Sequence, residues 1–225
     1  MILSSEKHYA DRRDAAQRLG ESLSGHGVHH PLILGIPRGG VVVADEIAQK
    51  LNADLDVALT RKLGAPGNPE LAIGAVAENG TILIQEQIAE KVGADEDYIR
   101  QEKTRQFAEI SARRDRYRSV LPKTPLDGRW VILVDDGIAT GATMQASIWA
   151  AREEGPGRIV VAVPVASQDA IERLSLDADE VICPYIPELF YAIGQFFDDF
   201  SQVGDEEVVE ILRAHSRKTG VNLGG

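Results

Sequence analysis

The chain has 225 residues, of which 44% are hydrophobic, and a formal net charge of −11 at pH 7. This length and composition are typical of one globular domain with a sizeable core, and we assign residues 1–225 to a single domain. The negative charge disfavours nucleic acid and anionic membranes as partners, because both would be repelled. We therefore expect any phosphate-binding site to be local.

The cysteine content and the distribution of apolar residues bear on location. A single cysteine, Cys183, excludes an internal disulfide framework and favours a reducing compartment. The first residues carry charge where a signal peptide needs an apolar stretch, and no run of about 18 apolar residues occurs. We expect a cytoplasmic protein that does not enter a membrane.

The first part of the chain alternates between helical and extended patterns. In chain order the sequence predicts a helix at 9–23, a strand at 31–36, a helix at 41–51 and a strand at 54–60. Residues 61–70 contain two prolines and two glycines, which indicates a loop. Two apolar runs, 71–77 and 81–85, flank Glu78, Asn79 and Gly80, a pattern typical of a β-hairpin.

The second part begins with a charged helical segment and then returns to alternation. Residues 86–120 are rich in Glu, Lys and Arg and are predicted to form a helical insertion. There follow, in order, a strand at 129–136, a helix at 141–155, a strand at 158–166, a short helix at 167–175, a strand at 179–184 and an amphipathic helix at 204–218. Such close alternation favours an α/β fold, a twisted and mainly parallel sheet flanked by helices.

The stretch VILVDDGIATGAT, residues 131–143, joins an apolar strand to two adjacent acids and a turn without basic residues. In a parallel sheet the loop after a strand borders the ligand crevice, and the next helix presents unpaired backbone amides there. Gly141 allows close approach, and Thr140 and Thr143 offer hydroxyl donors. This turn is predicted to hold a phosphate monoester.

The carboxylates of Asp135 and Asp136 have a different expected role, because they would repel a phosphate. We expect them to be exposed, and either to accept hydrogen bonds from vicinal sugar hydroxyls or to bind a divalent cation. A ribose 5-phosphate would satisfy both halves of the loop.

Other interpretations of the loop fit less well. A P-loop needs a lysine that GIATGAT lacks, and the spacing of a dinucleotide fingerprint is absent. A signalling receiver domain carries paired acids near its start, whereas about 130 residues precede them here. A purely structural alternative is that the acids simply end a strand and that Thr140 caps the following helix.

The loop resembles the phosphoribosyl pyrophosphate (PRPP) signature of the type I phosphoribosyltransferases, an apolar strand, two acids and a turn ending in T-G-x-T. The likeness covers about residues 30–185, and the whole sequence is similar to a bacterial group of stand-alone phosphoribosyltransferase-like proteins. The resemblance implies a Rossmann-like type I fold with a small hood, formed by about residues 183–218. It also implies a Mg²⁺-dependent transfer of the 5-phosphoribosyl group between PRPP and a nitrogenous base, with release of pyrophosphate.

The resemblance assigns roles within the loop. Asp135 and Asp136 would bind the ribose 2- and 3-hydroxyls and assist Mg²⁺, which PRPP itself would mainly hold. The ribose 5-phosphate would bind at the turn, which comprises Gly137, Ile138, Ala139, Thr140, Gly141, Ala142 and Thr143. A homodimer is an expectation from the family alone. A non-catalytic protein that binds PRPP or a nucleotide for regulation remains the alternative.

Pyrophosphate release requires a second anion site. The turn GIPRGG exposes backbone amides and a guanidinium, and the resemblance implies that Arg38, Gly39 and Gly40 bind pyrophosphate. Arg61 and Lys62 would add charge, with Lys62 and Arg38 also acting in catalysis. Residues 63–70 would form a lid. The arginines of RRDRYR, 113–118, either supply further cations or lie on a solvated or oligomer-contacting face, and the second interpretation is favoured.

The acceptor base is the least specified part. Some purine-using relatives place an aspartate where this chain has Ala139, which argues against 6-oxopurine chemistry. The aromatic segment 183–200 is loosely similar to the hood of purine-using relatives, with Tyr185 and Phe190 as candidates for stacking on the base. Packing of these aromatics against the C-terminal helix is the alternative. Cys183 is interpreted as a small buried hydrophobic residue.

Overall fold

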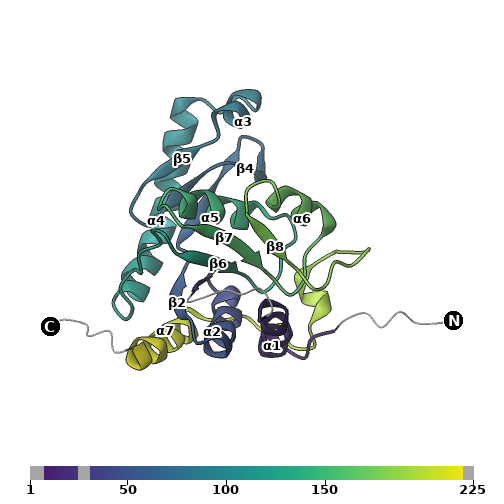
Figure 1. Cartoon of the computed structure of the whole chain (residues 1–225). Helices are drawn as coiled ribbons and strands as arrows, with labels where there is room; N and C mark the ends of the chain where they lie inside the picture. Colours follow the sequence, from purple (N-terminus) through teal and green to yellow (C-terminus); the bar gives the residue numbers. More distant parts are fainter. Residues whose placement is uncertain (1–7, 25–30, 220–225) are drawn as a thin grey trace.

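The computed structural model describes residues 8–24 and 31–219 (Figure 1). Its centre is a five-stranded sheet in the order β2-β1-β6-β7-β8, and its strands are parallel, as the sequence predicts. The strands are β1 (Leu32–Gly35), β2 (Asp54–Val57), β6 (Trp130–Val134), β7 (Arg158–Ala162) and β8 (Glu180–Ile182). Parallel pairing places the carboxyl ends of β1 and β6 side by side, in register from Leu32 and Val131 onward.

Helices cover both faces of this sheet. One face carries α1 (Arg12–Leu23), α2 (Gly39–Leu51) and α7 (Asp205–Thr219), and the other carries α5 (Ala142–Arg152) and α6 (Gln168–Leu174). Neighbouring residues of one strand serve opposite cores, so that Ile132 packs under α2 and Leu133 packs under α5. The α/β class predicted from the alternation is confirmed. None of the helices within the described ranges has an apolar stretch long enough to cross a membrane.

A second, antiparallel sheet confirms the predicted hairpin at 71–85, where β4 and β5 pair, and departs from the sequence prediction in its first strand. Its strands are β3 (Thr60–Ala65), β4 (Asn68–Ala77) and β5 (Ile82–Ile84). The predicted strand at 54–60 is therefore wrong in part, because the chain leaves the parallel sheet after Val57. The loop predicted at 61–70 is also wrong. Its prolines and glycines make a tight turn, with Gly67 at a φ of 72°, while Leu63 and Ala65 on one side of the turn enter a small core.

The charged insertion forms two helices, α3 (Glu86–Lys91) and α4 (Glu96–Arg118). At the end of α4, the Arg118 guanidinium lies 2.6 Å from Asp56 Oδ1 and 2.8 Å from Glu78 Oε2. This side chain is 15% exposed, so the solvated face favoured from the sequence is wrong for Arg118. The ion pair of Arg118 with Asp56 connects the helical insertion to β2, an edge strand of the parallel sheet.

A separate aromatic cluster joins the segment before α1 to the segment before α7. The Tyr9 amide donates to the Phe196 carbonyl at 2.9 Å, and the Asp198 amide donates to the Tyr9 carbonyl at 2.9 Å. The Tyr9 hydroxyl donates to the Pro164 carbonyl at 2.8 Å, and burial raises the pKa of Tyr9 to about 12. These contacts bring the start of α1 beside the carboxyl ends of the parallel strands.

Candidate functional site

The start of α2 and the loop after β6 meet at one edge of the parallel sheet, and a pair of glycines allows this close approach. Gly39 and Gly40 are the first two residues of α2, directly after the turn that follows β1, and the two acids follow β6. A Cβ on Gly39 would lie 1.9 Å from Asp136 Oδ2, and one on Gly40 would lie 2.7 Å from the Val134 carbonyl oxygen. Both positions exclude a side chain. The glycines expected to approach a ligand therefore also approach the acid pair.

The segment from Gly137 to Thr143 is held by the junction of β7 and α6. The Ile138 amide donates to the Val165 carbonyl at 3.0 Å, and the Ser167 hydroxyl donates to the Ala139 carbonyl at 2.6 Å. Gly141 has a φ of 79° and immediately precedes α5, and Thr140 and Thr143 are exposed. Contacts from the segment between β7 and α6 thus fix the turn. Its exposed hydroxyls and the first backbone amides of α5 are donors of the kind that bind an anion at a helix N-terminus.

The acid pair has a partner that sequence analysis missed, Arg12 at the start of α1. Its Nε donates to Asp136 Oδ2 at 2.7 Å, and the two side chains are only 11% and 12% exposed. The expectation that both acids are exposed is therefore wrong for Asp136. Burial, followed by the charge of Asp136, raises the pKa of Asp135 well above its usual range, and Arg12 partly opposes this shift.

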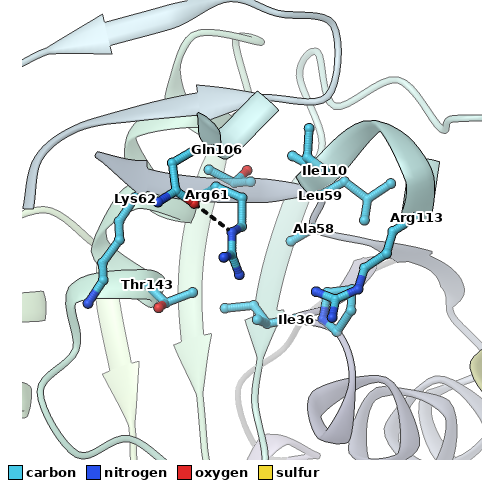
Figure 2. A pocket seen from close by; sticks show the side chains of 11 residues that line it. Ile36, Ala58, Leu59, Arg61, Lys62, Gln106, Ile110, Arg113 and Thr143 are labelled. Atoms are coloured by element: carbon cyan, nitrogen blue, oxygen red, sulfur yellow. Dashed lines mark hydrogen bonds between the residues drawn. The ribbon is translucent and has the colours of Figure 1, made fainter. Parts of the chain in front are cut away.

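A cavity of about 120 Å³ borders the turn after β1 (Figure 2). Its lining includes Pro37 of that turn, Arg61 and Lys62 of β3, Arg113 of α4 and Thr143. The structure thus brings the predicted cations on β3 next to Thr143. Thr143 belongs to the segment 137–143, which is predicted to bind a phosphate and is called the phosphate turn below.

Arg61 is held in place by α4. Its Nε donates to Gln106 Oε1 at 3.0 Å, and its Nη2 pairs with Glu109. Figure 2 shows its guanidinium extending from the strand into the cavity. An anion entering here meets a cation whose orientation is already fixed.

A carboxylate links Lys62 to the phosphate turn. Lys62 Nζ lies 2.9 Å from Glu70 Oε1, and the Thr140 hydroxyl donates to Glu70 Oε2 at 3.1 Å. The hydrogen bond from Lys62 lowers the pKa of Glu70. The segment predicted as a lid thus belongs to a hairpin whose Glu70 contacts the phosphate turn.

Two further arginines belong to the predicted cations, Arg38 at the N-cap of α2 and Arg113 on α4. Within the described residues no hydrogen bond or ion pair engages the Arg38 side chain, whereas Arg113 Nε lies 3.5 Å from Asp205 Oδ1. Burial and a hydrogen bond to Asp205 raise the pKa of Tyr117, and the charges of Arg113 and Arg38 both oppose this shift. Arg113 lines the cavity, where it adds a cation to Arg61 and Lys62.

The aromatic segment reaches the phosphate turn through Ile193. A Cβ on Gly137 would lie 2.5 Å from the Ile193 side chain. The rings of Tyr185 and Phe190 pack on Phe196, with centroids 5.5 and 5.2 Å away. Cys183 is only partly buried, which differs from the prediction, and its thiol donates to the Tyr185 carbonyl at 3.2 Å.

The acid pair offers carboxylate oxygens as possible ligands for a metal ion. Residues 8–24 and 31–219 contain no group of three or more His, Cys, Asp or Glu side chains placed to share a metal ion. Carboxylate oxygens are nonetheless suitable ligands for Mg²⁺, which often uses one or two of them together with substrate phosphates and water. Asp135 and Asp136 fit that partial role.

The five-stranded parallel sheet with helices on both faces defines the class as an α/β protein. The model of the phosphoribosyl transferase domain matches residues 1–200, and the chain belongs to this family. The predicted membership is confirmed.

Individual relatives agree with this assignment. The protein TT1426 from Thermus thermophilus has a crystal structure with a TM-score of 0.88 and 48% identity, covering 92% of this chain and 98% of that chain. Two Mycobacterium tuberculosis proteins, MT0597 and Rv0571c, carry provisional phosphoribosyl transferase names. Each is 41% identical over 210 residues, 93% of this chain and 47% of the relative. The chain thus spans about half the length of these two relatives.

A shorter match concerns the ribose-phosphate pyrophosphokinase of Sulfurisphaera tokodaii. It is 35% identical over 100 residues, which is 43% of this chain and 32% of that protein.

Proposed function

We propose that the protein transfers the 5-phosphoribosyl group between PRPP and a nitrogenous base and releases pyrophosphate. The observation that carries the proposal is the placement of an acid pair, a phosphate turn and a cation-lined cavity at one edge of the sheet. These three features match the hydroxyls, the 5-phosphate and the pyrophosphate of one ligand. Membership of the phosphoribosyl transferase family supports the same activity.

Asp135 and Asp136 hold the ribose in this proposal. Each carboxylate accepts a hydroxyl hydrogen bond, which fixes the ring in one orientation. The 5-phosphate binds the segment from Gly137 to Thr143, where the exposed hydroxyls of Thr140 and Thr143 and the first amides of α5 donate to it.

The pyrophosphate binds across the turn after β1. Its donors are Arg38 of that turn, the first residues of α2, Gly39 and Gly40, and Arg61 and Lys62 of β3. Lys62 exchanges Glu70 for a phosphate oxygen. Mg²⁺, when bound through Asp135 or Asp136 and the ligand, supplies further positive charge near the leaving group. The enzyme provides no nucleophile in this scheme.

The proposed reaction is a substitution at the anomeric carbon of the ribose. The C–O bond to pyrophosphate breaks and its electron pair leaves with the pyrophosphate, which Arg38 and Lys62 stabilise. Positive charge develops on the ribose ring, as in glycoside chemistry. A nitrogen lone pair of the base forms the new bond, and a base N–H proton is lost to solvent.

The acceptor is proposed to bind beside the aromatic segment, which Ile193 holds against Gly137 of the loop after β6. Tyr185 and Phe190 are the proposed aromatic contacts, although both rings also pack on Phe196. The exposed Ala139 offers no acid to manage a proton, which disfavours 6-oxopurines. A cytoplasmic location and a homodimer complete the proposal, the first from the single cysteine and the second from the family.

The direct test is pyrophosphate release from PRPP and Mg²⁺ with a panel of purines, pyrimidines and related heterocycles. Turnover with one of these acceptors supports the transferase. Saturable PRPP binding without product from any acceptor supports the regulatory alternative instead. If PRPP fails to bind at millimolar concentration, both are wrong.

A further inference from the structure

We infer that Arg12 is a positioning residue for PRPP, which orients the Asp136 carboxylate and offsets its charge while the ribose hydroxyls bind. This inference rests on the proposed function and adds to it a residue outside the two turns. Arg12 belongs to α1, and 124 positions separate it from Asp136.

Three contacts fix the Arg12 guanidinium. Its Nε donates to Asp136 Oδ2 at 2.7 Å, and its Nη1 donates to the Ser201 carbonyl at 2.8 Å. Its central carbon lies 3.9 Å from the centroid of the Phe200 ring. A cation held on one side by a ring and on two edges by oxygens has little freedom to move. The carboxylate that it binds is therefore fixed as well.

The contact leaves Asp136 able to bind a ligand. A carboxylate has about four acceptor sites, and Arg12 uses one of them on Oδ2. Ribose hydroxyls can occupy the remaining sites without displacing the guanidinium. Arg12 therefore orients the group rather than competing for it.

Charge gives Arg12 a second effect. PRPP carries several negative charges, and two adjacent carboxylates at its ribose would repel it. In the part of the chain that the structure describes, Arg12 is the cation that contacts the acid pair, whereas Lys62 and Arg61 line the cavity across the turn. With a side chain that is 11% exposed, its charge is only weakly screened by solvent.

The next residue offers a matched control. Arg13 lies on the same helix and pairs with Glu46 of α2, and its side chain is 51% exposed. The apolar anchors of the helix, the buried Ala16, Leu19 and Leu23, are unchanged in variants of either arginine. A change at Arg13 removes the same charge from the same helix without touching the acid pair.

The experiment measures the dissociation constants of PRPP with Mg²⁺ and of inorganic pyrophosphate, by calorimetry, for wild type, Arg12→Gln, Arg12→Lys and Arg13→Gln. We expect Arg12→Gln to weaken PRPP binding about tenfold or more, the effect of losing a charged hydrogen bond. Pyrophosphate has no ribose, so its affinity should change less than twofold. Arg12→Lys should recover part of the loss, and Arg13→Gln should match wild type.

A double-mutant cycle with Asp136→Asn gives an independent readout. If Arg12 acts through Asp136, Arg12→Gln should change PRPP affinity less than twofold in the Asp136→Asn background. Wild-type PRPP affinity in Arg12→Gln overturns the inference, and so does an equal loss for PRPP and pyrophosphate. If thermal unfolding shows that Arg12→Gln is misfolded, the Arg12→Lys variant is used instead. A loss of affinity for PRPP alone then supports the inference, and an equal loss of affinity for PRPP and pyrophosphate overturns it. Absence of PRPP binding to wild type overturns the proposed function as well.

Discussion

Two arginines in this protein reach carboxylates near the ends of parallel strands, and their surroundings differ. Arg118 donates from Nη1 to Asp56 at 2.6 Å and from Nε and Nη2 to Glu78 at 2.8 Å each. The backbone amides of Val57 and Thr124 complete the shell around Asp56, which is 1% exposed. This cluster is closed, because its acids have donors on every side.

The cluster at the end of β6 is open by comparison. Arg12 gives one hydrogen bond to one oxygen of Asp136, and Asp135 accepts from a backbone amide at 2.9 Å. Burial and the neighbouring charge of Asp136 raise the pKa of Asp135, and burial also raises the pKa of Asp56, so the number of donors and not the direction of the pKa shift separates the two clusters. The comparison teaches that a strand-end acid becomes a candidate binding group when the fold leaves it acceptor sites to spare.

Removal of both open acids should have the largest effect on the ligand. We expect Asp135→Asn with Asp136→Asn to weaken PRPP binding on the order of a hundredfold or more, since each lost charged hydrogen bond contributes about 1.5–3 kcal/mol. Asparagine keeps an oxygen that can accept from Arg12, so the fold should survive. Calorimetry measures the affinity and circular dichroism the fold. Unchanged affinity in a folded double mutant would remove the hydroxyl-binding role of these acids.

The closed cluster should respond in stability instead. Arg118→Met leaves Asp56 and Glu78 buried without their cation, and we expect a loss of about 3–5 kcal/mol in the free energy of unfolding. Urea denaturation measures this loss. Arg116→Met is the matched control on the same helix, because the ion pair of Arg116 with Glu206 is exposed and should contribute little. Equal stability of the two variants would contradict the distinction between closed and open clusters.

A substitution of Gly39 tests how tightly the start of α2 packs against Asp136. An alanine there would place its Cβ 1.9 Å from Asp136 Oδ2, so the carboxylate must move away from Arg12. We expect Gly39→Ala to weaken the binding free energy of PRPP by about 1–3 kcal/mol, which is comparable to the energetic cost of overpacking a protein core. Gly93→Ala is a control without steric consequence, since nothing lies within 4 Å, although its φ of 69° adds some strain. The hypothesis of a tight fit fails if Gly39→Ala binds PRPP as wild type does.

The smallest expected effect concerns Glu70, whose side chain is 61% exposed. Glu70→Gln should free Lys62 and strengthen pyrophosphate binding a few-fold, because the carboxylate no longer competes with the anion. The pKa of Glu70 is lowered, so the competing carboxylate persists at neutral pH and is lost as pH falls through that lowered value. The difference between Glu70→Gln and wild type should therefore be seen at pH 7 and shrink in acid. A difference that grows in acid would exclude this competition.

The general fold and the acid-rich loop could be predicted because their signals are local. Alternating apolar runs and glycine turns are sufficient for the parallel sheet, and DDGIATGAT lies within one strand-turn-helix unit. The strands around Pro66 and Gly67 were missed for the opposite reason. Local turn residues indicated a loop, whereas pairing across the hairpin and the burial of Leu63 and Ala65 decide the structure.

Long-range partners could not be predicted. Arg12 and Arg13 are adjacent and chemically identical in the sequence, and only the orientation of α1 determines that Arg12 contacts Asp136 and Arg13 contacts Glu46. The same limit applied to Arg118, whose partners lie 40 and 62 positions away. A charged run looks solvated until the elements that face it are known.

A crystal structure of the wild-type protein with PRPP and Mg²⁺ tests the division of the ligand most directly. We predict the ribose hydroxyls within about 3 Å of the Asp135 and Asp136 oxygens, with the 5-phosphate on residues 139–143. The Arg12 contact to Asp136 should be retained. A ligand whose phosphate lies beside the acids, or whose ribose lies away from them, would contradict the proposed site.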